Sequence, residues 1–538
     1  MEQLEKKIKF LANLFQHLDG IALIPTVIKL QHKQVLEYIQ SKNKCSLTEL
    51  SSKFNANECY MNVALRLLCS QGVLKQKIIN EDVYFTDVNI EQWFSLDLLT
   101  HYQMLNPLFN NDIDYNEIIE YSKENNNNKS VLYQVIYKYL EWRKEDKTTD
   151  STTQKNCTGK WSNWRIHLEG AVLGPILVLL SRNNCFSQIQ SNKTLIIKIN
   201  QDWKTLIENL FLACEILDSN MKLTDYGSFI LTRASSYGVT VSYLPTYRNI
   251  HNLIYGDFNI LKAASVDAEE LHVDRSMNVW GSGGAHNTYF KKIDKIILDL
   301  FNLPIEQQPK GFIDIGCGNG KLIEHIFDLI YYNTNRGKIL NEHPLFIVGS
   351  DFNYKALEAT TKTINQADIW AKTAFGDISD PDGLAHKLKQ EHNINLVDLL
   401  NVRSFLDHNR IYTTPKERNQ EFNESTGAFC SNGLRLQNRN VQQNLKEHLK
   451  RWYPYLTKYG LLIVELHTID PFLSSKNIGK TAITAYDASH GFSNQYILEY
   501  DIFLKIAHKI GLQPDPEHEY TFPTREIPIV SINRLIAN

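Results

Sequence analysis

Apolar residues recur in two different periods, and the change of period divides the chain. Over residues 1–100 they lie three and four positions apart, as in KQVLEYIQ and MNVALRLLCSQGVL, which predicts amphipathic helices. Ser46 stands as an N-cap before one of these helices, and an alternating segment, VYFTDV, follows the last of them. Three helices followed by a short hairpin are typical of a winged helix, so we expect a winged-helix-like module over residues 1–110.

From about residue 285, short apolar runs alternate with helical segments. GFIDIG, LFIVGSDF, TAFGDI, LVDLLNV, LLIVELH and IPIVSINRL are typical of strands, and segments such as KLIEHIFDLIYY are typical of helices. This alternation predicts an α/β domain that is doubly wound around a mainly parallel sheet. Ligands of such sheets bind beyond the carboxyl ends of the strands, so the residues that follow each strand are the candidate site residues.

The sequence between the N-terminal helices and the α/β region resembles the sequence of the N-terminal helices. IALIPTVIKL (21–30) resembles AVLGPILVLL (171–180), and LRLLCSQGVL resembles NLFLACEILD (209–218). Two related modules would explain this sequence similarity. The alternative is a chance similarity between unrelated amphipathic helices. Polar segments at 123–130 and 143–160 separate the two copies. We therefore expect a helical and linker insertion over 111–160, a second helical lid module over 161–277, and the α/β core over 278–538.

Composition restricts the functional classes. Lys and Arg number 57 against 60 Asp and Glu, which argues against binding nucleic acid through a broad basic surface. The eight cysteines include no C-x-x-C pair, which fits a reducing compartment and disfavours structural zinc frameworks. The run Ala171–Leu180 is half of a membrane span, and the N-terminus does not resemble a signal peptide. We expect a cytoplasmic protein with no membrane contact.

The segment FIDIGCGNGKLIEHI carries the clearest chemical signal. Gly316, Gly318 and Gly320 give G-x-G-x-G spacing, whereas a dinucleotide turn has G-x-G-x-x-G. Glycine permits the positive φ angles of such a turn and lets a ligand approach the backbone. Asp314 ends the strand before it. A carboxylate there is poorly placed against pyrophosphate, but it suits the cationic groups of S-adenosylmethionine.

Acidic residues also follow the next two strands. Asp351 is placed to accept both ribose hydroxyls, the role of the acidic residue in nucleotide-binding α/β folds. Asp377, which follows Gly376, is placed to accept the adenine amino group, and Phe352 and Ile378 to sandwich the ring. Three acidic residues at successive strand ends make the chain resemble class I S-adenosylmethionine-dependent methyltransferases over about residues 280–538.

Further candidates lie before and after these strands. NVWGSGGAHNTYF precedes the core and predicts a loop able to wrap a ligand, with a plain glycine-rich linker as the alternative. Its candidate cofactor contacts are Trp280, Gly281, Gly283 and Gly284. RSFLDHNR follows the fourth strand, VELHT ends the fifth, and YDASHGFSNQY comes soon after. Histidine and oxygen ligands in these segments suit an octahedral Fe or Mn site, although a solitary histidine is more often a satisfied polar residue.

Together these segments resemble the methyltransferase domains that open the apratoxin and saxitoxin polyketide synthases. The resemblance implies a seven-stranded Rossmann-like core and a C-methyltransferase with a mononuclear Fe or Mn. It also implies a malonyl-type substrate on an acyl carrier protein. The metal ligands would be His467, His490 and Gln495, with Asp487 or Asp407 able to replace one of them.

The chemistry is consistent with that resemblance. A dication chelated by both carbonyl oxygens would stabilise the enolate, and methyl transfer would then depend on orientation. His408 or His286 is the candidate general base, and Glu465 or Arg403 would orient the metal ligands. The alternative for each is a buried salt bridge or hydrogen bond. We expect the N-terminal modules to act as a lid with a substrate channel, and we leave a homodimer open.

Two other functions compete. One is a metal-independent O-methyltransferase for small phenols or alcohols, with His467 or His490 as the base. The other is a regulatory winged-helix protein that binds S-adenosylmethionine as a signal, against which the histidine-bearing strand ends argue.

Overall fold

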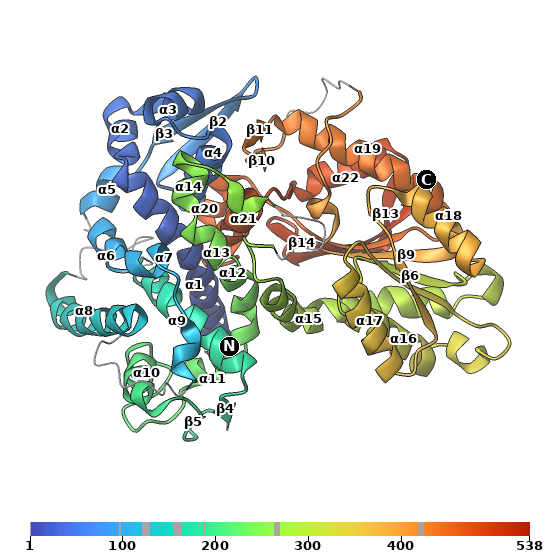
Figure 1. The fold of residues 1–538 in the computed structure, drawn as a ribbon, viewed down its shortest axis with the longest axis horizontal. Coiled ribbons are helices and arrows are strands. Elements are labelled where there is room, and N and C mark those ends of the chain that lie inside the picture. Colours follow the sequence, from blue (N-terminus) through green and yellow to red (C-terminus); the bar gives the residue numbers. More distant parts are fainter. Residues whose placement is uncertain are drawn as a thin grey trace. The chain divides into compact units, whose positions relative to one another are not determined.

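The structure is a computed structural model that describes residues 2–95, 98–120, 130–153, 164–187, 189–262, 270–417 and 424–538. The chain divides into two compact units (Figure 1). The helical unit comprises Met1–Lys262, Glu270–Ala285 and Pro471–Ser493, and the sheet unit comprises His286–Asp470 and Asn494–Asn538. The core predicted over 278–538 is therefore not continuous, because 471–493 leaves it for the helical unit.

The start of the helical unit has the order of helices and strands that a winged helix requires. Ser46 caps α3 by accepting a hydrogen bond from the Glu49 backbone N–H at 3.1 Å, and the three strands form an antiparallel sheet in the order β1-β3-β2. The winged-helix-like module over residues 1–110 stays a prediction. In chain order these helices and strands are α2 (Val35–Lys42), β1 (Lys44–Ser46), α3 (Leu47–Phe54), α4 (Glu58–Ser70), β2 (Leu74–Ile79) and β3 (Asp82–Asp87).

Two long helices, α1 (Glu2–His32) and α9 (Trp164–Arg182), pack together in this unit. A Cβ atom on Gly20 would lie 2.4 Å from the His167 Cα, and one on Gly170 would lie 2.3 Å from the His17 Cα. The two sequences align as HLDGIALIP and HLEGAVLGP, so the same positions make reciprocal contacts. The two glycines therefore allow the backbones of α1 and α9 to approach closely at equivalent positions.

By length and composition, α1 and α9 are also the two helices of the described chain able to cross a membrane. Of their most apolar windows, 78% and 67% is buried inside the protein, as is typical of core helices. The predicted linker at 143–160 is partly helical, because α8 (Val131–Thr153) covers its first half, while 154–163 lies outside the described residues.

The remaining helical-unit elements connect and cover this helix pair. They are α5 (Ile90–Ser95), α6 (Leu98–Met104), α7 (Asn106–Asn110), β4 (Phe186–Ser187), β5 (Ile196–Ile197), α10 (Gln201–Ala213), α11 (Asp225–Leu231), α12 (Gly238–Ser242), α13 (Leu244–Arg248), α14 (Ile250–Tyr255), α20 (Pro471–Lys476) and α21 (Ile483–Gly491).

The sheet unit contains the predicted seven-stranded, mostly parallel sheet, in the order β13-β14-β12-β9-β6-β7-β8. β14 runs antiparallel to both of its neighbours. β6 and β12 are buried along their whole length, which explains their continuous apolar runs. The strands are β6 (Gly311–Ile315), β7 (Phe346–Asp351), β8 (Ala371–Phe375), β9 (Leu399–Ser404), β12 (Leu461–Leu466), β13 (Leu512–Pro523) and β14 (Pro528–Ala537).

Helices cover both faces of this sheet, with α16 and α17 on one side and α19 and α22 on the other (Figure 1). β9 lies between β6 and β12 and is parallel to both. The carboxyl ends of these three central strands therefore meet at one edge. The other elements are α15 (Arg275–Phe301), α16 (Lys321–Asn333), α17 (Tyr354–Gln366), α18 (Pro381–His392), β10 (Phe429–Ser431), β11 (Leu434–Leu436), α19 (Asn438–Leu456) and α22 (Tyr500–Lys509).

Candidate active site

The turn between β6 and α16 has the shape expected of a cofactor turn. Gly316, Gly318 and Gly320 have φ angles of 77°, 55° and 75°, in the region that favours glycine. The Gly316 N–H donates to the Ser350 carbonyl at 2.8 Å, which joins the turn to β7. A Cβ atom on Gly318 would meet nothing within 4 Å, so this side of the turn is open to a ligand.

Asp314 stands just before this turn and is only 2% exposed. Burial, and then the nearby Asp351 carboxylate, raise the pKa of Asp314 to about 7. A buried carboxylate that is costly to ionise in the free protein suits a ligand that brings a positive charge. This environment fits the ammonium group of S-adenosylmethionine.

Asp351 and Asp377 take the predicted places after the next two strands. Asp351 Oδ2 accepts from the Gly318 N–H at 3.1 Å, and Oδ1 accepts from the Asn353 N–H at 3.0 Å, so this carboxylate is fixed against the cofactor turn. Asp377 Oδ1 accepts from the Ser379 N–H at 2.7 Å. The parallel pairing of β6, β7 and β8 brings the three acidic strand ends to one edge.

The predicted adenine neighbours differ in their surroundings. Phe352 is 55% exposed, whereas Ile378 is half-buried against the core and its carbonyl accepts from the Trp452 indole N–H at 2.7 Å. A Cβ atom on Gly376 would lie 2.5 Å from Ser350 Oγ, so close packing already requires glycine there. The stacking role of Phe352 and Ile378 stays a prediction.

A buried histidine–carboxylate pair lies at the ends of the two central strands. His408, in the turn after β9, and Glu465, in β12, are joined by a 2.5 Å contact between Nδ1 and Oε1. Glu465 also accepts from the backbone N–H groups of His408 at 3.3 Å and Leu466 at 2.8 Å. Both residues were predicted as site residues from the sequence, but their contact with each other was not.

The turn that bears His408 lies against the cofactor turn. A Cβ atom on Gly316 would be 3.0 Å from the Leu406 side chain, so the two turns are in contact. Arg403 pairs with the residue before His408. Its Nη1 donates to Asp407 Oδ1 at 2.8 Å, and His448 Nε2 lies 3.0 Å from the same oxygen. Sequence analysis missed His448, because a histidine in the middle of an amphipathic helix carries no local signal.

The predicted glycine-rich loop before the core is wrong, because this segment forms part of α15. A Cβ atom on Gly281 would lie 2.5 Å from the Val239 backbone nitrogen, and Trp280 lies against Gly238. Gly281 therefore serves close backbone packing inside the helical unit. Gly283 has open space around it. The surroundings of Gly284 and the side chain of His286 lie outside the described residues, so their roles stay predictions.

The predicted metal ligands are divided between the two units, with His490 in the helical unit and His467 and Gln495 in the sheet unit. The His467 ring nitrogens contact the Leu498 carbonyl at 3.1 Å and Ser531 Oγ at 2.8 Å, and burial lowers the pKa of His467 to about 4. His490 Nδ1 lies 2.7 Å from the Tyr486 carbonyl. Gln495 is buried in the sheet unit. Among the described residues, no three His, Cys, Asp or Glu side chains gather as metal ligands.

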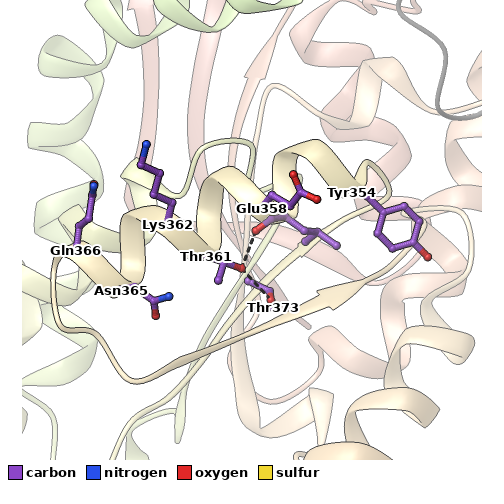
Figure 2. Close-up of a pocket in the computed structure, with 8 residues that line it drawn as sticks. Tyr354, Glu358, Thr361, Lys362, Asn365, Gln366 and Thr373 are labelled. Atoms are coloured by element: carbon purple, nitrogen blue, oxygen red, sulfur yellow. Dashed lines mark hydrogen bonds between the residues drawn. The ribbon is translucent and has the colours of Figure 1, made fainter.

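A surface cleft of about 740 Å³ lies elsewhere, between α17 and the edge strand β8. Figure 2 shows Thr361 pointing from α17 toward Thr373 on β8, with 3.3 Å between their hydroxyls. None of the acidic strand-end residues lines this cleft. It is separate from the cofactor turn.

Family comparisons agree with this geometry. Residues 270–533 match the AprA MT2-like domain, residues 10–76 match the AprA N-terminal domain, and residues 169–257 match the AprA winged helix domain. With the seven-stranded fold, they show that the chain is a class I S-adenosylmethionine-dependent methyltransferase. The three matches cover most of the chain and confirm the narrower resemblance, to the methyltransferase region of AprA.

Solved structures show more distant similarity. The citrinin polyketide synthase CMeT domain is 12% identical, covering 76% of this chain and 95% of its own, with a TM-score of 0.30. The CurJ carbon methyltransferase is 11% identical, covering 76% and 97%, with a TM-score of 0.32. An O-methyltransferase family 2 protein from Planctomyces limnophilus is 9% identical, covering 97% and 94%, with a TM-score of 0.35. No curated protein matches the chain.

Proposed function

We propose that the protein transfers a methyl group from S-adenosylmethionine to the α-carbon of a malonyl-type acyl group. The acyl group would be carried by an acyl carrier protein in polyketide-type biosynthesis. The His408–Glu465 pair beside the cofactor turn supports this proposal, because methylation of carbon requires a base. The match to AprA domains supports the polyketide context.

The direction of the hydrogen bond between His408 and Glu465 suits a general base. A carboxylate only accepts hydrogen bonds, so the His408 Nδ1 must carry the proton in the 2.5 Å contact with Glu465. In the neutral ring, Nε2 is then the nitrogen with a lone pair. This nitrogen takes the α-proton, and the Glu465 carboxylate stabilises the imidazolium that forms.

Substrate orientation completes the reaction. The electron pair left on the α-carbon forms the new carbon–carbon bond, while the sulfonium supplies the methyl group and loses its positive charge. Asp314 is the residue placed to hold the ammonium group of the donor, and Asp351 is placed to hold the ribose. The Gly318 and Asn353 N–H groups hold the Asp351 carboxylate in place, and catalysis would depend mainly on positioning.

The contacts of His467 do not support a role for this residue as a metal ligand. A nitrogen that coordinates a metal uses its lone pair, and both His467 ring nitrogens already have hydrogen-bonding partners. We therefore derive no step through Fe or Mn. The same contacts also disfavour His467 as the base of an O-methyltransferase.

Intact-protein mass spectrometry of malonyl- and methylmalonyl-loaded carrier tests the proposal. We expect wild-type protein with S-adenosylmethionine to add one or two methyl masses, and the matched His408→Gln variant to add none in the same time. Parallel reactions with a chelator, and with added Fe or Mn, test metal dependence. Methylation of small phenols without any gain on carrier-bound acids would contradict the proposal in favour of O-methylation.

A further inference from the structure

A second charged cluster lies beside the His408–Glu465 pair, and the proposed reaction does not use it. It consists of Arg403 on β9, Asp407 in the turn, and His448 on α19. All three side chains are almost completely buried. Asp407 Oδ1 is the shared acceptor, 2.8 Å from Arg403 Nη1 and 3.0 Å from His448 Nε2. We call these residues the Asp407 cluster.

The Asp407 cluster fixes the backbone of the turn that carries the base. Asp407 directly precedes His408, and its carbonyl accepts from Arg410 Nη1 at 2.9 Å. The His408 carbonyl accepts from the Tyr496 N–H at 2.9 Å. Arg403 is itself held in place, since its guanidinium lies 4.1 Å from the centre of the Trp452 ring. The turn is therefore held by its side chains and by its carbonyls.

The cluster also balances buried charge. Burial alone would raise the pKa of Asp407, but Arg403 and His448 hold it well below its usual range. Burial lowers the pKa of His448 to about 4, so this ring is neutral and donates to Asp407. Arg403 Nε and Nη2, and Asp407 Oδ2, have no hydrogen-bonding partner among the described residues. The charges of Arg403 and Asp407 are therefore neutralised mainly by each other.

An uncompensated Arg403 would act on the pair beside it. The Arg403 guanidinium interacts electrostatically with Glu465, whose carboxylate faces the His408 ring. Among the described residues, the other charged or titratable groups that act on this turn include Arg410, Arg451, His448, His467 and Tyr496. Without the Asp407 charge, Arg403 would compete with the His408 imidazolium for Glu465.

We infer that Asp407 is a positioning residue for methyl transfer. It neutralises Arg403 and fixes the His408 turn, so that the full negative charge of Glu465 serves His408. Asp407 acts through His408 and does not touch the substrate. This inference rests on the proposed function for its kinetic consequence, but its structural consequence is measurable without a substrate.

Three variants separate charge balance from simple packing. Asp407→Asn leaves Arg403 unpaired. The double variant Arg403→Met with Asp407→Asn removes both charges and keeps only the unbranched stem of the arginine side chain, so it is the larger truncation. His448→Gln is the matched control, because it keeps a neutral donor for Asp407. Carrier-bound malonyl α-proton exchange in D₂O with S-adenosylhomocysteine measures proton removal, and kcat measures the complete transfer.

We expect Asp407→Asn to lower both rates by about 10- to 100-fold, and the double variant to recover at least about tenfold of that loss. His448→Gln should lose less than about tenfold. The affinity for S-adenosylmethionine should stay within about twofold in every variant. A double variant no faster than Asp407→Asn would overturn the inference, since simple packing predicts that larger truncation is worse.

An NMR measurement keeps this test independent of the substrate. In 13C-histidine-labelled protein, the His408 ring resonance is assigned as the one lost in His408→Gln. We expect Asp407→Asn to shift this resonance and the double variant to return it toward the wild-type position. An unmoved resonance in Asp407→Asn would contradict the inference even if methyl transfer is confirmed.

If wild-type protein methylates no carrier-bound acid, the proposed function fails while the NMR result still decides the positioning role. Should Asp407→Asn not fold, the double variant is compared with Arg403→Met alone, and the inference requires the double variant to have the wild-type-like resonance.

Discussion

The raised pKa of Asp314 makes cofactor binding depend on pH. In the free protein burial and Asp351 raise this pKa to about 7. A bound ammonium group would favour the ionised carboxylate and return the pKa toward its ordinary value near 3.8. Binding of S-adenosylmethionine must therefore release a proton from Asp314 wherever that residue is protonated beforehand.

The magnitude follows from the fraction of Asp314 that is ionised. With a pKa of about 7, roughly 9% of the free protein is ionised at about pH 6 and roughly half at about pH 7. Kd should therefore fall about fivefold over that interval. The interval ends at about pH 7 because an α-amino group, such as that of the ligand, itself titrates near pH 8.

Isothermal titration calorimetry in two buffers of different ionisation enthalpy measures both quantities. We expect roughly 0.9 proton released per ligand at about pH 6 and roughly half a proton at about pH 7. The control is Asp314→Asn, which should bind at least about tenfold more weakly and lose this pH dependence. A wild-type affinity that is flat from about pH 6 to about pH 7, with no proton release, would refute the reasoning.

The raised pKa of Asp314 also makes the stability of the ligand-free protein depend on pH. Because the pKa of Asp314 is higher in the folded protein than in the unfolded chain, the ligand-free fold loses stability as pH rises from about 4 to about 7. The cost is largest above that window, up to about 4 kcal/mol. Asp314→Asn should therefore raise the thermal stability of the ligand-free protein at about pH 8 while weakening cofactor binding.

Three other substitutions probe different parts of the molecule. Glu465→Gln should lower kcat by about 100-fold with cofactor affinity unchanged, because the amide cannot stabilise the His408 imidazolium; an equal loss of affinity in calorimetry would contradict this. Gly318→Ala has a φ of 55°, so it should lower the free energy of unfolding by about 1 kcal/mol, and its methyl group on the open side of the turn should also weaken cofactor binding; an unchanged melting temperature would contradict the first expectation. Gly20→Ala should destabilise the helical unit by at least about 2 kcal/mol in denaturant unfolding, because its Cβ would lie 2.4 Å from the His167 Cα; unchanged unfolding would show that α1 and α9 can separate freely.

The placement of the acidic strand ends and of the glycine turn was predictable because their signals are local. Asp314, Asp351 and Asp377 each follow an apolar run that becomes a strand, and parallel pairing alone brings strand ends together. The glycine turn has the same property, since the positive φ angles fall on the residues with the predicted spacing. Nothing distant in the sequence was needed to place these residues.

Local sequence signals were not sufficient where a distant residue determines the surroundings of a side chain. Gly281 was assigned to a loop, but the backbone at Gly238 and Val239 requires a glycine opposite it within the helical unit. His467 does end a strand, yet Ser531 on the antiparallel neighbour β14 contacts its second nitrogen. Sequence periodicity reveals neither partner, because each lies on a separate element.

Three buried carboxylates at one edge of the sheet differ in what neutralises them, and this difference separates their roles. Asp407 has the Arg403 guanidinium and a depressed pKa, which suits a fixed structural charge. Glu465 has the His408 ring, whose charge changes during proton transfer. Asp314 has a raised pKa, and burial and Asp351 both oppose its ionisation. Under the proposed function, the positive partner of Asp314 is the ammonium group of the methyl donor, which would then complete the charge balance of this site.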